Sequence, residues 1–131
     1  MEFIDLFCGI GGFRQALENK GLRCVFSSDW DKDAQDAYEL NYGERPWGDL
    51  TKIIASEIPR HDVLCGGFPC QPFSISGKRK GFDDSRGTLF FDISRIVKFH
   101  KPKVLILENV KNILSIDKGK TLETIRSILE N

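Results

Sequence analysis

Blocks of apolar residues alternate with mixed blocks along the chain, and this alternation predicts strands and helices in turn. Short, mostly apolar runs predict buried strands, and they lie at residues 3–7, 24–28, 63–65 and 104–107. Helical spacing or helix-forming composition predicts helices at residues 13–20, 32–40, 51–58, 89–100 and 121–130. The first three helices are expected to end at Gly21, at the stretch 42–46 and at Pro59.

Repeated strand–helix units predict an α/β fold with a mostly parallel sheet and right-handed crossovers, a Rossmann-like arrangement. In such sheets, ligands bind beyond the carboxyl ends of the strands. Three stretches rich in reactive or conformationally special residues fall at those ends, at 7–13, 66–74 and 108–110. We therefore expect one active site at that edge of the sheet.

The composition suits one soluble domain: 131 residues, 40% hydrophobic and 29% charged. No apolar run reaches the length of about 18 residues that a membrane helix needs, and the N-terminus lacks the pattern of a secretory signal. A cytoplasmic protein without membrane contact is expected. Lys+Arg and Asp+Glu each total 19, so any contact with nucleic acid must use a local basic patch.

Four cysteines are present, at positions 8, 24, 65 and 70. Without an export signal, reduced thiols are expected rather than disulfides. The spacing of Cys65 and Cys70, with His61 nearby, does not fit the tight pairs of zinc sites. No metal is therefore expected.

A glycine-rich loop, FCGIGGF at 7–13, follows the first predicted strand, and Asp29 ends the second. An acidic side chain there can accept hydrogen bonds from both ribose hydroxyls. A dinucleotide pattern would need glycine at position 14, where this chain has Arg14. The loop is better suited to a nucleoside with a short zwitterionic tail, such as S-adenosyl-L-methionine. Trp30 is either a face for adenine or sulfonium or a core residue, and Asp49 is a candidate partner for the adenine amino group.

The stretch GGFPCQPFS at 66–74 places Cys70 between Pro69 and Pro72. Prolines restrict their own φ and their neighbours', which holds the thiol where a strand gives way to a loop. Core residue, metal ligand and nucleophile are the alternatives. The position favours the nucleophile, whereas Cys65, inside the strand, is the better candidate for a core thiol.

Three ordered motifs, DLFCGIGGFR, GGFPCQPFS and ENV at 108–110, resemble those of the cytosine-5 DNA methyltransferases. The connecting segments SDWDKDAQDAYELNYGE and SGKRKGFDDSRGTLFFDISRIV resemble the bacterial modification methylases of restriction–modification systems, especially the HhaI-like ones. The resemblance covers essentially the whole chain. It implies transfer of a methyl group from S-adenosyl-L-methionine to C5 of a cytosine flipped out of duplex DNA, with S-adenosyl-L-homocysteine as product.

The resemblance implies that Cys70 adds to C6 of the cytosine and that Glu108 holds N3. Since a glutamate donates to N3 only when protonated, Glu108 is expected to be buried, with a raised pKa. The implied cofactor-binding residues are Phe7, Gly9, Ile10, Gly11, Gly12, Asp29, Trp30, Asp49, Leu50, Phe68 and Leu89. Relatives often carry glutamate where this chain has Asp29, a shorter reach to the ribose.

The predicted loop at 76–88 is polar and carries glycines that suit a lid over the substrate. Its basic residues form the local patch a neutral protein would need for phosphate contact. Taken alone, they would favour a solvated loop instead. The expected DNA-contact residues are Gln71, Ser74, Ser76, Lys78, Arg79, Lys80 and Arg86.

The later motifs and the target-recognition domain of the family have no counterpart before Asn131. Residues 1–131 are therefore expected to form part of a catalytic domain, from a fragment, a truncated product or one half of a split enzyme completed by a second chain. An exposed apolar sheet edge that favours self-association is also expected. A tRNA cytosine-5 methyltransferase and an inactive cofactor-binding module are the alternative functions.

Overall fold

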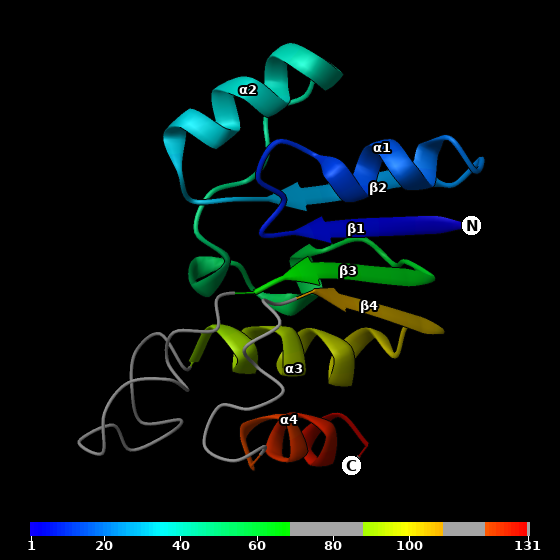
Figure 1. Ribbon diagram of the computed structural model, residues 1–131, viewed down its shortest axis with the longest axis vertical. Helices are drawn as coiled ribbons and strands as arrows, with labels where there is room; N and C mark the ends of the chain where they lie inside the picture. Colours follow the sequence, from blue (N-terminus) through cyan, green and yellow to red (C-terminus); the bar gives the residue numbers. More distant parts are fainter. Residues whose placement is uncertain (69–87, 109–119, 131) are drawn as a thin grey trace.

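A parallel sheet of four strands organises the computed structural model, which describes residues 1–68, 88–108 and 120–130 (Figure 1). The strands run in the order β2-β1-β3-β4, and each neighbouring pair is parallel. Their bounds are β1 Glu2–Leu6, β2 Arg23–Ser28, β3 Val63–Gly67 and β4 Val104–Glu108. The predicted α/β class, the parallel sheet and all four strands are confirmed.

The helices also follow the predicted order, with three differences. Their bounds are α1 Gly12–Glu18, α2 Lys32–Tyr42, α3 Thr88–His100 and α4 Lys120–Glu130. The first helix was predicted to end at Gly21, but it ends at Glu18, with Asn19 as its C-cap. α2 is longer than predicted, because Gly43, with a φ of 73°, is the residue that ends it. The helix predicted at 51–58 was wrong in form: it is two short 3₁₀ turns, η1 Leu50–Lys52 and η2 Ala55–Glu57. The backbone is extended at Ile53, where η1 ends, so one continuous helix cannot form.

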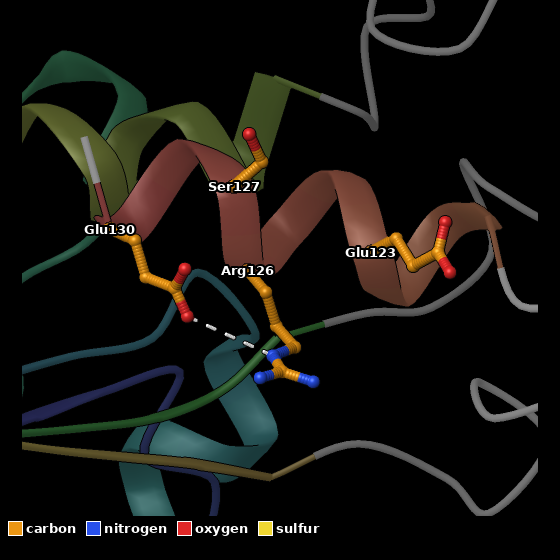
Figure 2. A pocket seen from close by; sticks show the side chains of 4 residues that line it. All are labelled: Glu123, Arg126, Ser127 and Glu130. Carbon is orange, nitrogen blue, oxygen red and sulfur yellow. Dashed lines mark ion pairs between the residues drawn. The ribbon is translucent and has the colours of Figure 1, made fainter.

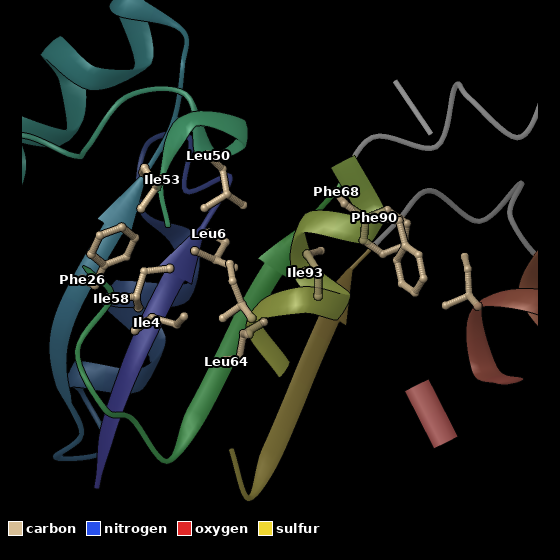
Figure 3. Close-up of a cluster of buried hydrophobic side chains, with 12 residues drawn as sticks. Ile4, Leu6, Phe26, Leu50, Ile53, Ile58, Leu64, Phe68, Phe90 and Ile93 are labelled. Carbon is tan, nitrogen blue, oxygen red and sulfur yellow. The ribbon is translucent and has the colours of Figure 1, made fainter. Parts of the chain in front are cut away.

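One face of the sheet packs against the 3₁₀ turns and the helix α3, and α4 packs against α3. Ile4, Leu6 and Leu64 from the strands meet Ile93 of α3 in this core, shown in Figure 3. Ile125 of α4 belongs to the same buried cluster. The residues that line this face alternate along each strand with residues facing the other way, as the pleat of a strand requires.

The opposite face packs against α1. Phe3, Val63 and Cys65 are buried there, with Phe13 and Leu17 of α1 packed against them. Cys65 is therefore the core thiol that the sequence predicted, and burial raises its pKa to about 12. Within the described part of the chain, Cys8, Cys24 and Cys65 are free thiols.

The outer strand β4 has an exposed edge. It pairs with β3, and each of its residues is exposed or half-buried, with Val104 43% exposed. An exposed apolar edge was predicted, and it is present among the described residues. Self-association through it stays a prediction. The described helices include none long and apolar enough to cross a membrane.

All four strands end on the same side of the molecule, where the turn after β1 and the starts of α2 and α3 also lie (Figure 1). The parallel order therefore gathers the chain segments that follow β1, β2, β3 and β4 along one edge. The candidate functional residues occupy this edge.

Candidate active site

The turn from β1 into α1 depends on its glycines to different degrees. Gly9 and Gly11 have φ of 56° and 96°, in the region that residues with side chains rarely adopt. A Cβ on Gly11 would also come within 2.8 Å of the Tyr42 ring and hydroxyl. Gly12, the first residue of α1, has open space where a Cβ would stand. The turn therefore requires glycine at 9 and 11 more than at 12.

Asp29 is hydrogen-bonded to this glycine turn. One carboxylate oxygen accepts the Gly9 N–H at 2.8 Å, and the other accepts the Asp31 N–H at 2.9 Å. Its own N–H donates to the Trp47 carbonyl at 2.9 Å. Each carboxylate oxygen has a further lone pair, so Asp29 can still accept hydroxyl groups. The glycine loop and Asp29, which were predicted to serve the same ligand, are therefore also in direct contact with each other.

Two apolar side chains are exposed at the same edge. Trp30 is 75% exposed and Ile10 is 67% exposed. The alternative that Trp30 is a core residue is therefore wrong. An exposed tryptophan beside a carboxylate gives an apolar face next to hydrogen-bond acceptors, which suits an aromatic or cationic ligand group.

Asp49 lies at the start of η1 and already has local partners. One carboxylate oxygen accepts the Thr51 N–H at 2.9 Å and the Thr51 hydroxyl at 2.7 Å. It thus caps the 3₁₀ turn. Leu50, the next residue, is buried, and the Leu50 carbonyl accepts a hydrogen bond from Arg95 of α3 at 2.8 Å. Arg95 therefore fixes the segment that carries Asp49.

Phe7, Leu50 and Phe68 belong to the same apolar core. Leu50 and Phe68 are buried in one cluster, and Phe7 packs against it. The Phe68 ring lies 5.6 Å from the Phe90 ring of α3, measured between centroids. These three predicted cofactor residues therefore belong to the core that lies beneath the edge of the sheet. Leu89 is in the first turn of α3, and its side chain lies outside the described residues.

Glu108 ends β4 directly beside Gly67, the last residue of β3. A Cβ on Gly67 would stand 3.1 Å from a carboxylate oxygen of Glu108. The side chain thus lies over the end of the strand that leads to Cys70. The predicted burial of Glu108 was wrong: it is exposed, because it is the last residue of an edge strand.

The remaining predicted site residues lie outside the described residues. They are the nucleophile candidate Cys70 and the DNA-contact candidates Gln71, Ser74, Ser76, Lys78, Arg79, Lys80 and Arg86. Their roles stay predictions.

Sequence reasoning missed the role of Arg14, which it treated only as a departure from a glycine pattern. Arg14 is 7% exposed and donates to Glu18 at 3.1 Å, to the Tyr38 hydroxyl at 3.3 Å and to Glu44. Burial lowers the pKa of Arg14, but the hydrogen bonds to Tyr38 and Glu44 outweigh it and hold the pKa above its ordinary value. The arginine therefore joins α1 to α2 behind the glycine turn. Its spacing of four from Glu18 was the one local signal in the sequence.

Asp5 is a second feature that the apolar pattern concealed. It is fully buried at the centre of β1, and the Tyr38 hydroxyl donates to one of its oxygens at 3.3 Å. The other oxygen has no hydrogen-bond partner. Burial raises the pKa of this carboxyl to about 7, against the lowering effects of Tyr38 and Arg14.

A further pocket lies on α4, lined by Glu123, Arg126, Ser127 and Glu130 (Figure 2). Its ion pair, Arg126 to Glu130 at 3.9 Å, joins two exposed side chains. The pocket contains none of the candidate residues, and it is the solvated face of the helix. Among the described residues, no cluster of three or more His, Cys, Asp or Glu side chains could hold a metal ion.

A glycine turn after the first strand of a parallel sheet, hydrogen-bonded to an acidic residue after the second, is the arrangement of Rossmann-like α/β folds. The model of one family, C-5 cytosine-specific DNA methylase, matches residues 1–131. The chain therefore belongs to the family of C-5 cytosine-specific DNA methylases.

Curated relatives share more than half of their aligned residues with the chain. Type II methyltransferase M.HhaI of Haemophilus parahaemolyticus is 61% identical over 129 residues, which are 98% of this chain and 39% of that protein. Type II methyltransferase M.HpaII of Haemophilus parainfluenzae is 57% identical, over 97% of this chain and 36% of that protein. The chain thus spans well under half the length of these relatives.

A solved structure of Dnmt2 methyltransferase from S. pombe has the same fold. It superposes with a TM-score of 0.82 at 27% identity, over 100% of this chain and 42% of that one. The predicted family resemblance and fold are therefore confirmed by sequence and structure alike.

Proposed function

We propose that residues 1–131 form the cofactor-binding and catalytic part of a cytosine-5 DNA methyltransferase that acts on duplex DNA. The observation that carries the proposal is the common edge of the sheet. Asp29 follows β2, the glycine turn follows β1, Gly67 ends β3 and Glu108 ends β4. The high identity to Type II methyltransferases supports a modification enzyme of a restriction–modification system, working in the cytoplasm on DNA.

The residues at this edge fit S-adenosyl-L-methionine by the chemistry of their side chains. The Asp29 oxygens that each hold one backbone N–H can accept the ribose hydroxyls as well. The exposed face of Trp30 suits adenine or the sulfonium, and Asp49 suits the adenine amino group. When bound, the cofactor supplies an electrophilic methyl group.

The chain's own residues would then prepare the cytosine. The Cys70 thiolate forms a bond to C6, and the electron pair of the C5–C6 double bond moves onto C5. Glu108 gives a proton to N3, which neutralises the charge that develops on the ring. After C5 accepts the methyl group, N3 returns its proton to Glu108 and the C5 proton passes to water. The electron pair of the C5–H bond re-forms the C5–C6 double bond as the bond between Cys70 and C6 breaks, which restores the aromatic ring and the thiolate. Gly67 leaves room for the carboxylate beside the strand that leads to Cys70.

Duplex DNA with 5-fluorocytosine at the target position tests the proposal. Fluorine at C5 cannot leave as a proton does, so the full-length protein and cofactor should form a covalent adduct, seen as a band that survives denaturation. Cys70→Ala should abolish the adduct. Cys65→Ala, which removes a core thiol remote from solvent, should keep it in whatever protein folds. No adduct with any duplex from a protein that binds cofactor would contradict the proposal.

The acceptor and the minimal active unit need their own experiments. Methylation of duplex DNA and of tRNA should be compared, with DNA expected as the acceptor because of the identity to Type II methyltransferases. We expect residues 1–131 alone to bind S-adenosyl-L-homocysteine in calorimetry without turnover. Activity restored by a second chain that carries the family's later motifs would support a split enzyme.

A further inference from the structure

We propose that Tyr42 is a positioning residue of the cofactor site, whose hydroxyl fixes the glycine turn against which the cofactor binds. The inference rests on the proposed function, because it assigns a role in cofactor binding. It concerns a residue that lies at the end of α2, 31 residues from the glycine turn in sequence.

The contact between Tyr42 and Gly11 is close and has two parts. The Tyr42 hydroxyl donates to the Gly11 carbonyl at 2.7 Å. The same carbonyl accepts the Gln15 N–H at 2.9 Å, the first helical bond of α1. The ring and hydroxyl also occupy the space that a Cβ on Gly11 would need. Tyr42 therefore fixes the direction of the Gly11 carbonyl and leaves no room for a side chain at position 11.

Tyr42 is itself held from two sides. The Arg14 guanidinium lies 4.7 Å from the centre of its ring, and the Tyr38 ring lies 4.8 Å away between centroids. Arg14 is in turn anchored by Glu18 and Glu44. Burial raises the pKa of the Tyr42 phenol, so the hydroxyl stays protonated and can donate at neutral pH. The side chain is thus a fixed donor.

The glycine turn is consequently held at both of its ends. Gly9 donates its N–H to Asp29, and Gly11 accepts from Tyr42. Both partners are held by α2. The Asp29 carbonyl accepts a hydrogen bond from the Gln35 side chain of α2, and Tyr42 is the last residue of that helix. A turn held in one shape loses less conformational freedom when a ligand binds, which raises affinity.

Tyr42→Phe tests the inference, because it keeps the ring and removes the hydroxyl. Loss of one hydrogen bond of ordinary net strength should weaken binding of S-adenosyl-L-homocysteine about three- to tenfold, measured by calorimetry well below the unfolding temperature. Hydrogen exchange of the Gly9 amide should become faster, since the turn is held from one side only.

Tyr38→Phe is the matched control. It removes a neighbouring hydroxyl that contacts Asp5 and Arg14 and not the turn. It should lower the unfolding temperature and leave the affinity and the Gly9 exchange rate unchanged. A purely structural role of Tyr42 predicts the same pattern for Tyr42→Phe, and that outcome would overturn the inference while the proposed function stands. If the unmodified protein fails to bind S-adenosyl-L-homocysteine, both fall.

Discussion

A carboxylate oxygen of Glu108 lies 3.1 Å from the position that a Cβ on Gly67 would take, a closer approach than side chains ordinarily make. The two residues are partners across β3 and β4. A side chain at position 67 would therefore push the carboxylate a few tenths of an ångström away from its place over the end of β3. The register of β3 and β4 therefore influences where the carboxylate of Glu108, the proposed acid, can lie.

Gly67→Ala should accordingly impair catalysis more than stability. The exposed end of Glu108 can move away from the new methyl group at little cost, but a displaced acid no longer meets N3. Since small misplacements of a catalytic group are costly, we expect the methylation rate to fall about tenfold or more. Single-turnover methylation would measure it.

The neighbouring glycine supplies the control for that experiment. A Cβ on Gly66 would meet Ile93, Leu107 and Leu6 at 3.5–3.9 Å, which is ordinary contact. Gly66→Ala should therefore leave the rate close to that of the unmodified enzyme. Equal losses in both variants would contradict a specific effect on Glu108.

Arg95→Lys should loosen the segment that carries Asp49. The arginine donates to Asp92 at 2.9 Å and to the Leu50 carbonyl at 2.8 Å, and lysine cannot reproduce this two-pronged geometry. We expect a loss of about 1 kcal/mol in the free energy of unfolding, measured in urea. Lys98→Arg on the same helix, where the side chain is exposed, should change nothing measurable. An unchanged urea midpoint for Arg95→Lys would show that the contact to Leu50 is dispensable.

Asp5 should make the protein less stable as the pH rises from about 4 to about 7. Its folded pKa is raised from 3.8 to about 7, so the folded state binds more protons than the unfolded state across this window. Folding is therefore favoured at the acidic end and loses that advantage as the pH passes the folded pKa. Asp5→Asn should flatten this part of the profile, measured as unfolding free energy against pH. A slope that the substitution leaves intact would assign it to other groups.

His61 should make the protein less stable as the pH falls, which is the opposite of the effect of Asp5. It is 2% exposed; one ring nitrogen lies 2.8 Å from the Pro59 carbonyl, and the other has no partner. Burial is the main cause that lowers its pKa from 6.5, with a smaller contribution from His100, whose ring centroid is 4.8 Å away. The unfolded state therefore binds the proton more readily, and stability falls as the pH drops below about 6.5.

His61→Phe retains an aromatic ring and removes the titrating group. Between pH 7 and pH 5, the free energy of unfolding should decrease less in this variant than in the unmodified protein. Because Asp5 acts oppositely in this range, the difference between variant and parent is the relevant quantity. Identical profiles would exclude His61 as the titrating group.

The sequence was sufficient for the four strands, for the order of the four longer helices and for part of the edge. The apolar run 63–65 identified a strand because burial on both faces leaves little freedom of composition. The pairing of Gly9 with Asp29 was predictable because adjacent parallel strands bring their ends together. The family motifs added roles for Cys70 and Glu108, of which Cys70 lies outside the described residues.

The polar cluster behind the turn was not predictable by the same means. Asp5, Arg14 and Tyr38 come from a strand and two helices, and their bonds span 24 and 33 residues of sequence. No local pattern encodes such contacts, since each depends on how the helices pack. The burial expected for Glu108 failed for a related reason: exposure at a strand end depends on the place of the strand in the sheet, and β4 is at its edge.

The strand order β2-β1-β3-β4 also sets the order in which the proposed functional groups follow one another along the edge of the sheet. In the proposed function, the ribose partner Asp29 follows β2, the glycine turn follows β1, the thiol follows β3 and the acid ends β4. Neighbouring strands lie about 4.8 Å apart, so the three intervals span about 14 Å. In the proposed function, the strand spacing would thus place methyl donor and acceptor side by side, and a shift of one strand would separate the two groups between which the methyl passes.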